Sequence, residues 1–183
     1  MTEKIIIIGP EVTDRMSIAK KISELDDSYV IAPTFTSDLD MQDKVTDNFE
    51  YYLSLDDIKL AFKNNAFMFV NSSGIDTVGI TYADMCTSDV FVLSFEDFNN
   101  ISSRILDEIN PVICWIDTKK KGYDSYKKDL TESKYVIEKI DEREIVTLYF
   151  NEDVDSSESI AHTMLTYMTG DEVIRAEILE ENS

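Results

Sequence analysis

The chain of 183 residues suits one domain, and its 43% of hydrophobic residues allow a sizeable core. It carries 37 acidic and 17 basic residues, which gives a net charge of −20. A field of that sign repels nucleic acid and anionic lipid, and no apolar run approaches the length of a membrane span. The N-terminus does not have the pattern of a signal peptide. We therefore expect a cytoplasmic protein without nucleic-acid or membrane partners.

The cysteines and the histidine point to no metal chemistry. Cys86 and Cys114 lack the spacing of a metal site and lie near apolar strands, which is typical of inert, reduced thiols. His162 is the one histidine, and it falls in a helical pattern without a second ligand nearby. The sequence therefore predicts no metal site.

The first predicted strand, residues 4–9, holds four consecutive isoleucines and ends in Gly-Pro, as buried parallel strands often do. Apolar residues at helical spacing predict a helix over 15–25. A second short strand is predicted at 29–32.

Residues 34–79 interrupt the alternation of strands and helices. The stretch 34–48 is polar and acidic, with no clear period. We then predict, in chain order, a strand at 50–53, a helix at 55–64, a strand at 66–71 and a turn-rich segment at 72–79. These elements predict a small subdomain, residues 34–85, inserted after the second strand.

The alternation then resumes to the end of the chain. The predicted elements are a strand at 89–93, a helix at 95–109, a strand at 111–116, a charged helix at 122–142, a strand at 145–150 and a helix at 156–168. Such alternation predicts an α/β fold of three layers around a five-stranded parallel sheet. Its core would be residues 1–33 and 86–170, followed by an acidic tail at 171–183 that could be a frayed helix.

The turn after the first strand has the layout of a phosphate-binding loop. The working motif is G-x-x-x-x-G-K-[ST], and residues 9–17 read GPEVTDRMS. Gly9 is kept, but Asp14 stands at the second glycine, Arg15 at the lysine and Met16 at the first hydroxyl. Asp14 and Glu11 bring negative charge towards the phosphates, and a thioether does not bind a hard cation such as Mg²⁺. An ordinary strand-to-helix turn is the alternative interpretation.

The resemblance extends beyond this loop. Residues 5–22, IIIIGPEVTDRMSIAKKI, resemble the opening of guanylate kinases, a strand followed by G-P-S-G-x-G-K-S-T and a helix. Residues 50–85 are similar to the nucleotide-monophosphate subdomain of that family, residues 90–96 to a strand ending in acidic residues, and residues 145–168 to its closing strand, N-[DE]-D segment and helix. The resemblance implies a P-loop NTPase-like fold whose inserted subdomain corresponds to the one that binds the monophosphate.

The family's functional residues carry over poorly. Asp38 and Met41 stand at or near the two arginines that grip the acceptor phosphate. Phe69 stands at the guanine-reading carboxylate, and Ile80 at a hydroxyl. The resemblance implies a vestigial phosphate loop of Gly9, Pro10, Arg15 and Ser17, and a vestigial acceptor site of Thr34, Tyr51, Gly79 and Glu96.

A cluster of lysines, in contrast, could indicate that some phosphate binding is kept. Five of them gather where the family's lid carries cations to the donor phosphates: Lys119, Lys120, Lys121, Lys127 and Lys128. They could keep some phosphate affinity, or they could form a solvated loop and helix start.

Three functions are compatible with these patterns. The first is a catalytically inactive guanylate-kinase-like protein without catalytic residues or cofactor, which binds or inhibits a protein partner, possibly one with a basic surface. The second is a divergent nucleoside or deoxynucleoside monophosphate kinase that uses ATP and Mg²⁺. The third, based on net charge alone, is an acidic decoy that imitates nucleic acid.

Overall fold

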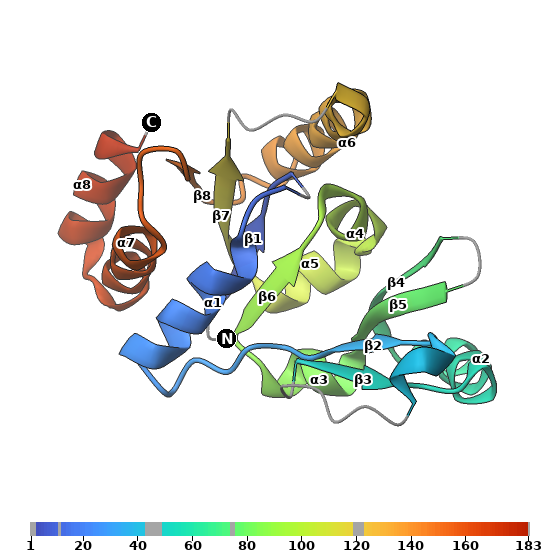
Figure 1. The fold of residues 1–183 in the computed structure, drawn as a ribbon. Coiled ribbons are helices and arrows are strands. Elements are labelled where there is room, and N and C mark those ends of the chain that lie inside the picture. Colours follow the sequence, from blue (N-terminus) through green and yellow to red (C-terminus); the bar gives the residue numbers. More distant parts are fainter. Residues whose placement is uncertain (1–2, 11, 43–48, 74–75, 119–122, 183) are drawn as a thin grey trace.

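The computed structural model describes residues 3–10, 12–42, 49–73, 76–118 and 123–182. A parallel sheet with helices on both faces forms the centre of the molecule (Figure 1). Its strands are β1 (Lys4–Ile8), β6 (Val90–Leu93), β7 (Pro111–Asp117) and β8 (Thr147–Asn151). They lie in the order β6-β1-β7-β8, and every neighbouring pair is parallel. The predicted α/β fold with a parallel sheet is confirmed.

The isoleucines of β1 explain why both faces of this sheet are covered. All four are fully buried, and since side chains alternate along a strand, Ile6 and Ile8 pack into one hydrophobic cluster while Ile5 and Ile7 pack into the other. The second cluster takes side chains from α1 (Arg15–Leu25) and α7 (Ser157–Thr169). The first takes them from α4 (Phe95–Asn100), α5 (Ser103–Ile109) and α6 (Tyr123–Asp141).

The prediction of five parallel strands is wrong by one. The stretch 29–32 makes only an isolated parallel bridge, between Ile31 and Val90 at the outer edge of β6. The Ala32 N–H donates to the Val90 carbonyl at 2.8 Å, so the chain does follow the path of a fifth strand. A turn ends at Ser28 and Pro33 follows, so too few residues lie between them for a longer ladder.

A second sheet of four strands lies beside the first, in the order β3-β2-β5-β4. Its elements are β2 (Thr34–Thr36), the short 3₁₀ helix η1 (Leu39–Met41), β3 (Glu50–Tyr52), α2 (Leu55–Lys63), β4 (Phe67–Ser73), β5 (Asp76–Thr81) and α3 (Tyr82–Thr87). Part of the segment predicted as turns therefore forms β5, which pairs antiparallel with both β4 and β2.

One helical prediction also needs correction. The helix predicted over 95–109 is two helices, because Ile101 and Ser102 are extended and the Ser102 hydroxyl caps α5 by accepting from the Ile105 N–H at 3.4 Å. The acidic tail forms the helix α8 (Glu172–Glu181), fixed by Arg175, which donates to both carboxylate oxygens of Glu3 at 2.8 and 3.1 Å. Within the described residues, no helix is both long and apolar enough to cross a membrane.

Candidate functional site

The turn that follows β1 keeps the close approach that a phosphate loop needs. A Cβ added at Gly9 would lie 2.6 Å from the Ile116 carbonyl oxygen and 2.9 Å from the Thr13 hydroxyl, so only glycine fits there. The Thr13 N–H and hydroxyl both donate to the Pro10 carbonyl, at 3.0 and 2.6 Å. The loop is therefore closed by bonds to itself, and Thr13 is buried.

Two carboxylates of the chain itself take the N–H groups at the start of α1. Asp14 caps the helix by accepting from the Ser17 N–H at 3.2 Å, and it also accepts from the Ser17 hydroxyl at 2.6 Å. The Asp14 N–H donates to Glu152, at 3.1 Å, in the loop after β8. A helix N-terminus attracts anions, and here it is satisfied by carboxylates of the protein.

The basic residue of the loop is also engaged. An Nη1 atom of Arg15 donates to the Leu93 carbonyl at the end of β6. Met16, at the position of the Mg²⁺ ligand, is partly buried against the cluster beneath α1 and α7. Together with the Asp14 and Glu152 carboxylates, these contacts do not fit a bound magnesium triphosphate.

The vestigial acceptor residues fall into two places. The strand register aligns Tyr51 on β3 with Phe35 on β2, and Phe35 with Gly79 on β5, while Thr34 on β2 donates to the Phe49 carbonyl at 3.3 Å. Glu96 lies apart from them, in the first turn of α4. Three of the four candidates are thus built into the second sheet.

Tyr51 is bound by that sheet and its flanking helix. Its hydroxyl donates at 2.7 Å to Asp84 of α3, which also accepts from the Thr81 hydroxyl at 2.5 Å. Burial and then the bond to Asp84 raise the pKa of the Tyr51 phenol. At Gly79, an added Cβ would lie 2.5 Å from the Phe69 carbonyl and 2.9 Å from the Phe35 ring. Both residues therefore have structural roles.

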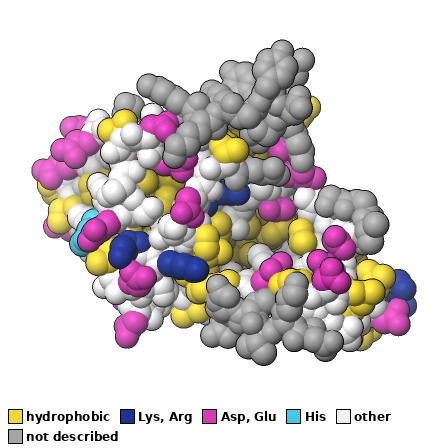
Figure 2. Space-filling view, viewed as in Figure 1, with side chains coloured by type: hydrophobic (Ala, Val, Ile, Leu, Met, Phe, Trp, Pro, Cys, Tyr) yellow, Lys and Arg dark blue, Asp and Glu magenta, His cyan; other side chains and the backbone are white. Residues whose placement is uncertain are grey.

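Phe69 and Ile80 join the two sheets. They are 4% and 0% exposed and belong to the same hydrophobic cluster as Ile6 and Ile8 of the parallel sheet. Figure 2 shows hydrophobic side chains gathered in the hollow between the two halves of the molecule. Phe69 and Ile80 are thus part of a core that is continuous between the two sheets.

The lysine cluster is left untested. Lys119, Lys120 and Lys121 lie outside the described residues, and Lys127 and Lys128 fall in α6 at positions whose side chains the structure does not describe. Sequence reasoning missed Glu152 and Asp84 as partners of the candidate residues. Both residues are far from their partners in the sequence. Only Glu152 could have been found, because it follows a parallel strand and therefore lies at the same edge of the sheet as the loop after β1.

Comparison with known proteins supports the fold. The structure is similar to the crystal structure of guanylate kinase from Anaplasma phagocytophilum, with a TM-score of 0.52 and 11% identity over 98% of this chain and 94% of that one. A sugar kinase from Janibacter sp. HTCC2649 gives a TM-score of 0.40 and 12% identity over 95% and 98% of the two chains, which carries no argument. No protein-family model and no curated protein matches the sequence. The fold is thus that of P-loop kinases.

Proposed function

We propose that this protein is a catalytically inactive member of the kinase-fold class that works by binding another protein. The observation that carries the proposal is the loop after β1, where two N–H groups, those of Asp14 and Ser17, donate to the carboxylates of Glu152 and Asp14. Phosphoryl transfer depends on positioning and on positive groups around the transferred phosphate. The loop offers carboxylates in that place, and Arg15 is bonded to a strand carbonyl.

The second sheet supports the same proposal. Binding of a nucleoside monophosphate requires a polar, open cleft next to the loop, whereas Phe69 and Ile80 fill the corresponding positions with buried hydrocarbon. Opening that contact would expose the side chains to water at about 2–3 kcal/mol each. The sheet therefore serves as a fixed surface, which suits a binding protein.

The net charge suggests the character of the partner. Acidic side chains are spread over the face seen in Figure 2, with few Lys or Arg between them. At −20, this charge raises the encounter rate with a basic surface and lowers it with an acidic one. A protein with a basic face is the partner that we propose.

A coupled ADP-release assay tests the proposal. Purified protein is given Mg-ATP with GMP, dGMP, dTMP or dUMP, and we expect no turnover above the protein-free rate. Loss of a single stabilising contact typically lowers a rate by ~10²–10³-fold, and several are missing here. Turnover that disappears in Arg15→Ala would overturn the proposal and establish a divergent kinase. The matched control is Arg104→Ala, an arginine remote from the loop.

A further inference from the structure

The outer edge of the second sheet borders the largest groove among the cavities described. Strand β4 is the last strand of this sheet and pairs only with β5. Its residues Phe67 to Val70 line a groove of about 1170 Å³, whose opposite wall is the junction of α4 and α5. Because N–H and C=O groups on the free side of an edge strand lack a strand partner, such an edge can accept an added strand.

The walls of this groove combine apolar and polar side chains. Phe62 is 52% exposed at its rim and meets the Phe67 ring edge-on, with the ring centroids 5.1 Å apart. Ile105 of α5 lies on the facing wall. An exposed aromatic side chain beside an unpaired strand can receive an alternate side chain of an added segment.

Arg104 gives the groove a charge opposite to that of the protein. It is the one charged side chain lining the groove, and it is exposed. Arg15, Arg143 and Arg175 all make hydrogen bonds within the protein, whereas Arg104 makes no hydrogen bond or ion pair with the described residues. An exposed guanidinium beside a groove is suited to a carboxylate.

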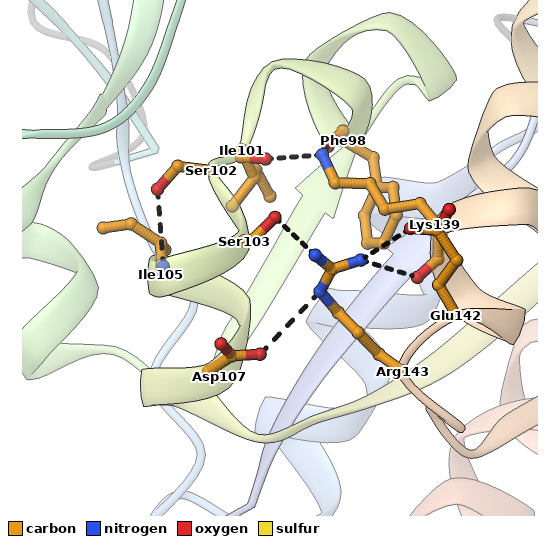
Figure 3. A network of polar contacts seen from close by, with 9 residues as sticks. All are labelled: Phe98, Ile101, Ser102, Ser103, Ile105, Asp107, Lys139, Glu142 and Arg143. Atoms are coloured by element: carbon orange, nitrogen blue, oxygen red, sulfur yellow. Dashed lines mark hydrogen bonds and ion pairs between the residues drawn. The ribbon is translucent and has the colours of Figure 1, made fainter.

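The α4–α5 junction, which forms the facing wall, is held by hydrogen bonds from Lys139 and Arg143, as Figure 3 shows. The Lys139 ammonium of α6 donates to the carbonyls of Phe98, Asn99 and Ile101, at 3.2, 3.0 and 2.5 Å. Arg143 donates to the Ser103 hydroxyl at the start of α5. The α4–α5 junction therefore has a defined shape before anything binds, which lowers the entropic cost of binding.

We propose that this groove binds an extended segment of a partner protein as a fifth strand along β4. The segment places apolar side chains on Phe62 and Ile105 and a carboxylate opposite Arg104. About four residues at ~3.3 Å each would match the stretch from Phe67 to Val70 of β4. This rests on the proposed function and names the surface that performs it. A second copy of the chain is a poor occupant, because two chains of −20 repel each other. The carboxylate is a local contact, while the charge of the rest of the partner acts at longer range.

Peptide binding measured by fluorescence anisotropy tests the inference. The probes are labelled seven-residue peptides of alternating valine and threonine, with one aspartate moved through the sequence. We expect binding that depends on the aspartate position. Arg104→Glu should weaken the best peptide by about tenfold or more, as expected for a charge-assisted hydrogen bond. Lys59→Glu, the same charge change on α2 outside the groove, should leave the affinity unchanged.

N-methylated peptides test the strand pairing itself. Methylation of alternate amides that face β4 should abolish binding, and methylation of the other set should preserve it. The inference is overturned if no peptide binds, if both methylated sets bind equally, or if Arg104→Glu binds as well as Lys59→Glu. Concentration-dependent dimers in sedimentation that Arg104→Glu dissociates would also overturn it, in favour of self-association. Each of these results leaves the ADP-release assay unchanged, so failure of the groove is distinguishable from failure of the proposed function.

Discussion

Replacing Phe69 by alanine tests whether the second sheet is joined to the parallel sheet through a shared core. The Phe69 side chain is 4% exposed and lies in the cluster that contains Ile6 and Ile8 of β1. Truncation of a buried phenylalanine typically costs ~3–5 kcal/mol, from lost burial and from the cavity left behind. For a domain of this size, such a loss lowers the melting temperature by roughly 10 °C.

The only tryptophan of the chain makes the measurement specific. Trp115 lies on β7 of the parallel sheet, 9% exposed, and belongs to the same cluster as Phe69. Urea unfolding followed by Trp115 fluorescence therefore reports the parallel sheet, while far-ultraviolet circular dichroism reports the whole chain. We expect Phe69→Ala to shift both transitions to lower urea together.

Phe62→Ala is the matched control. Phe62 is also an aromatic residue of the second sheet's lobe, but it is 52% exposed and contacts mainly the edge of Phe67. Its truncation should cost ~1 kcal/mol, the typical value of an aromatic pair. Equal losses in the two variants, or a Trp115 transition that does not move in Phe69→Ala, would refute a shared core.

Two further predictions concern the loop and the second sheet. The triple variant Asp14→Gly, Arg15→Lys, Met16→Ser should bind Mg-ATP more tightly than the wild type in isothermal titration, yet show no ADP release; an unchanged affinity would contradict the role given to the carboxylate. Above pH ~10, a tyrosine of the unfolded chain loses its proton. Because the pKa of Tyr51 is raised in the folded state, the folded protein keeps the Tyr51 proton at this pH. The contribution of this group to the free energy of unfolding should therefore be constant below pH ~10 and fall above it. In urea titrations at a series of pH values, Tyr51→Phe should make that fall shallower. An equally steep fall in the variant would exclude Tyr51 as a contributor.

The parallel sheet could be predicted because its signals are local. The isoleucines of β1 are apolar on both faces of a strand, and that pattern alone requires helices on both sides of the sheet. The strand β5 could not be predicted in the same way, because Asp76 and Gly79 have weak strand preferences. Its conformation depends on pairing with β4 and β2, which no local pattern shows.

The sequence suggested residues for a candidate site, which stays a prediction, and it could not give their geometry. The sequence showed that Asp14 is unsuited to phosphate, and it could not show that the Asp14 N–H binds Glu152, 138 residues further along the chain. The resemblance implied that Phe69 stands where a carboxylate is expected, and the sequence could not show which surface buries the ring. Long-range contacts of this kind depend on the complete fold, so they appear only in the structure.

The residues that stand at the expected kinase positions stabilise the fold. Asp14 caps α1, a contact whose removal by alanine typically costs ~1 kcal/mol, and Arg15 fixes the end of β6. Phe69 and Ile80 bury hydrocarbon where a monophosphate site would need polar groups. Active-site residues usually lower the stability of a protein, because groups that serve chemistry lack hydrogen-bond partners in the absence of substrate. Each of these positions thus has a structural partner within the protein, which is what the proposed loss of phosphate binding requires.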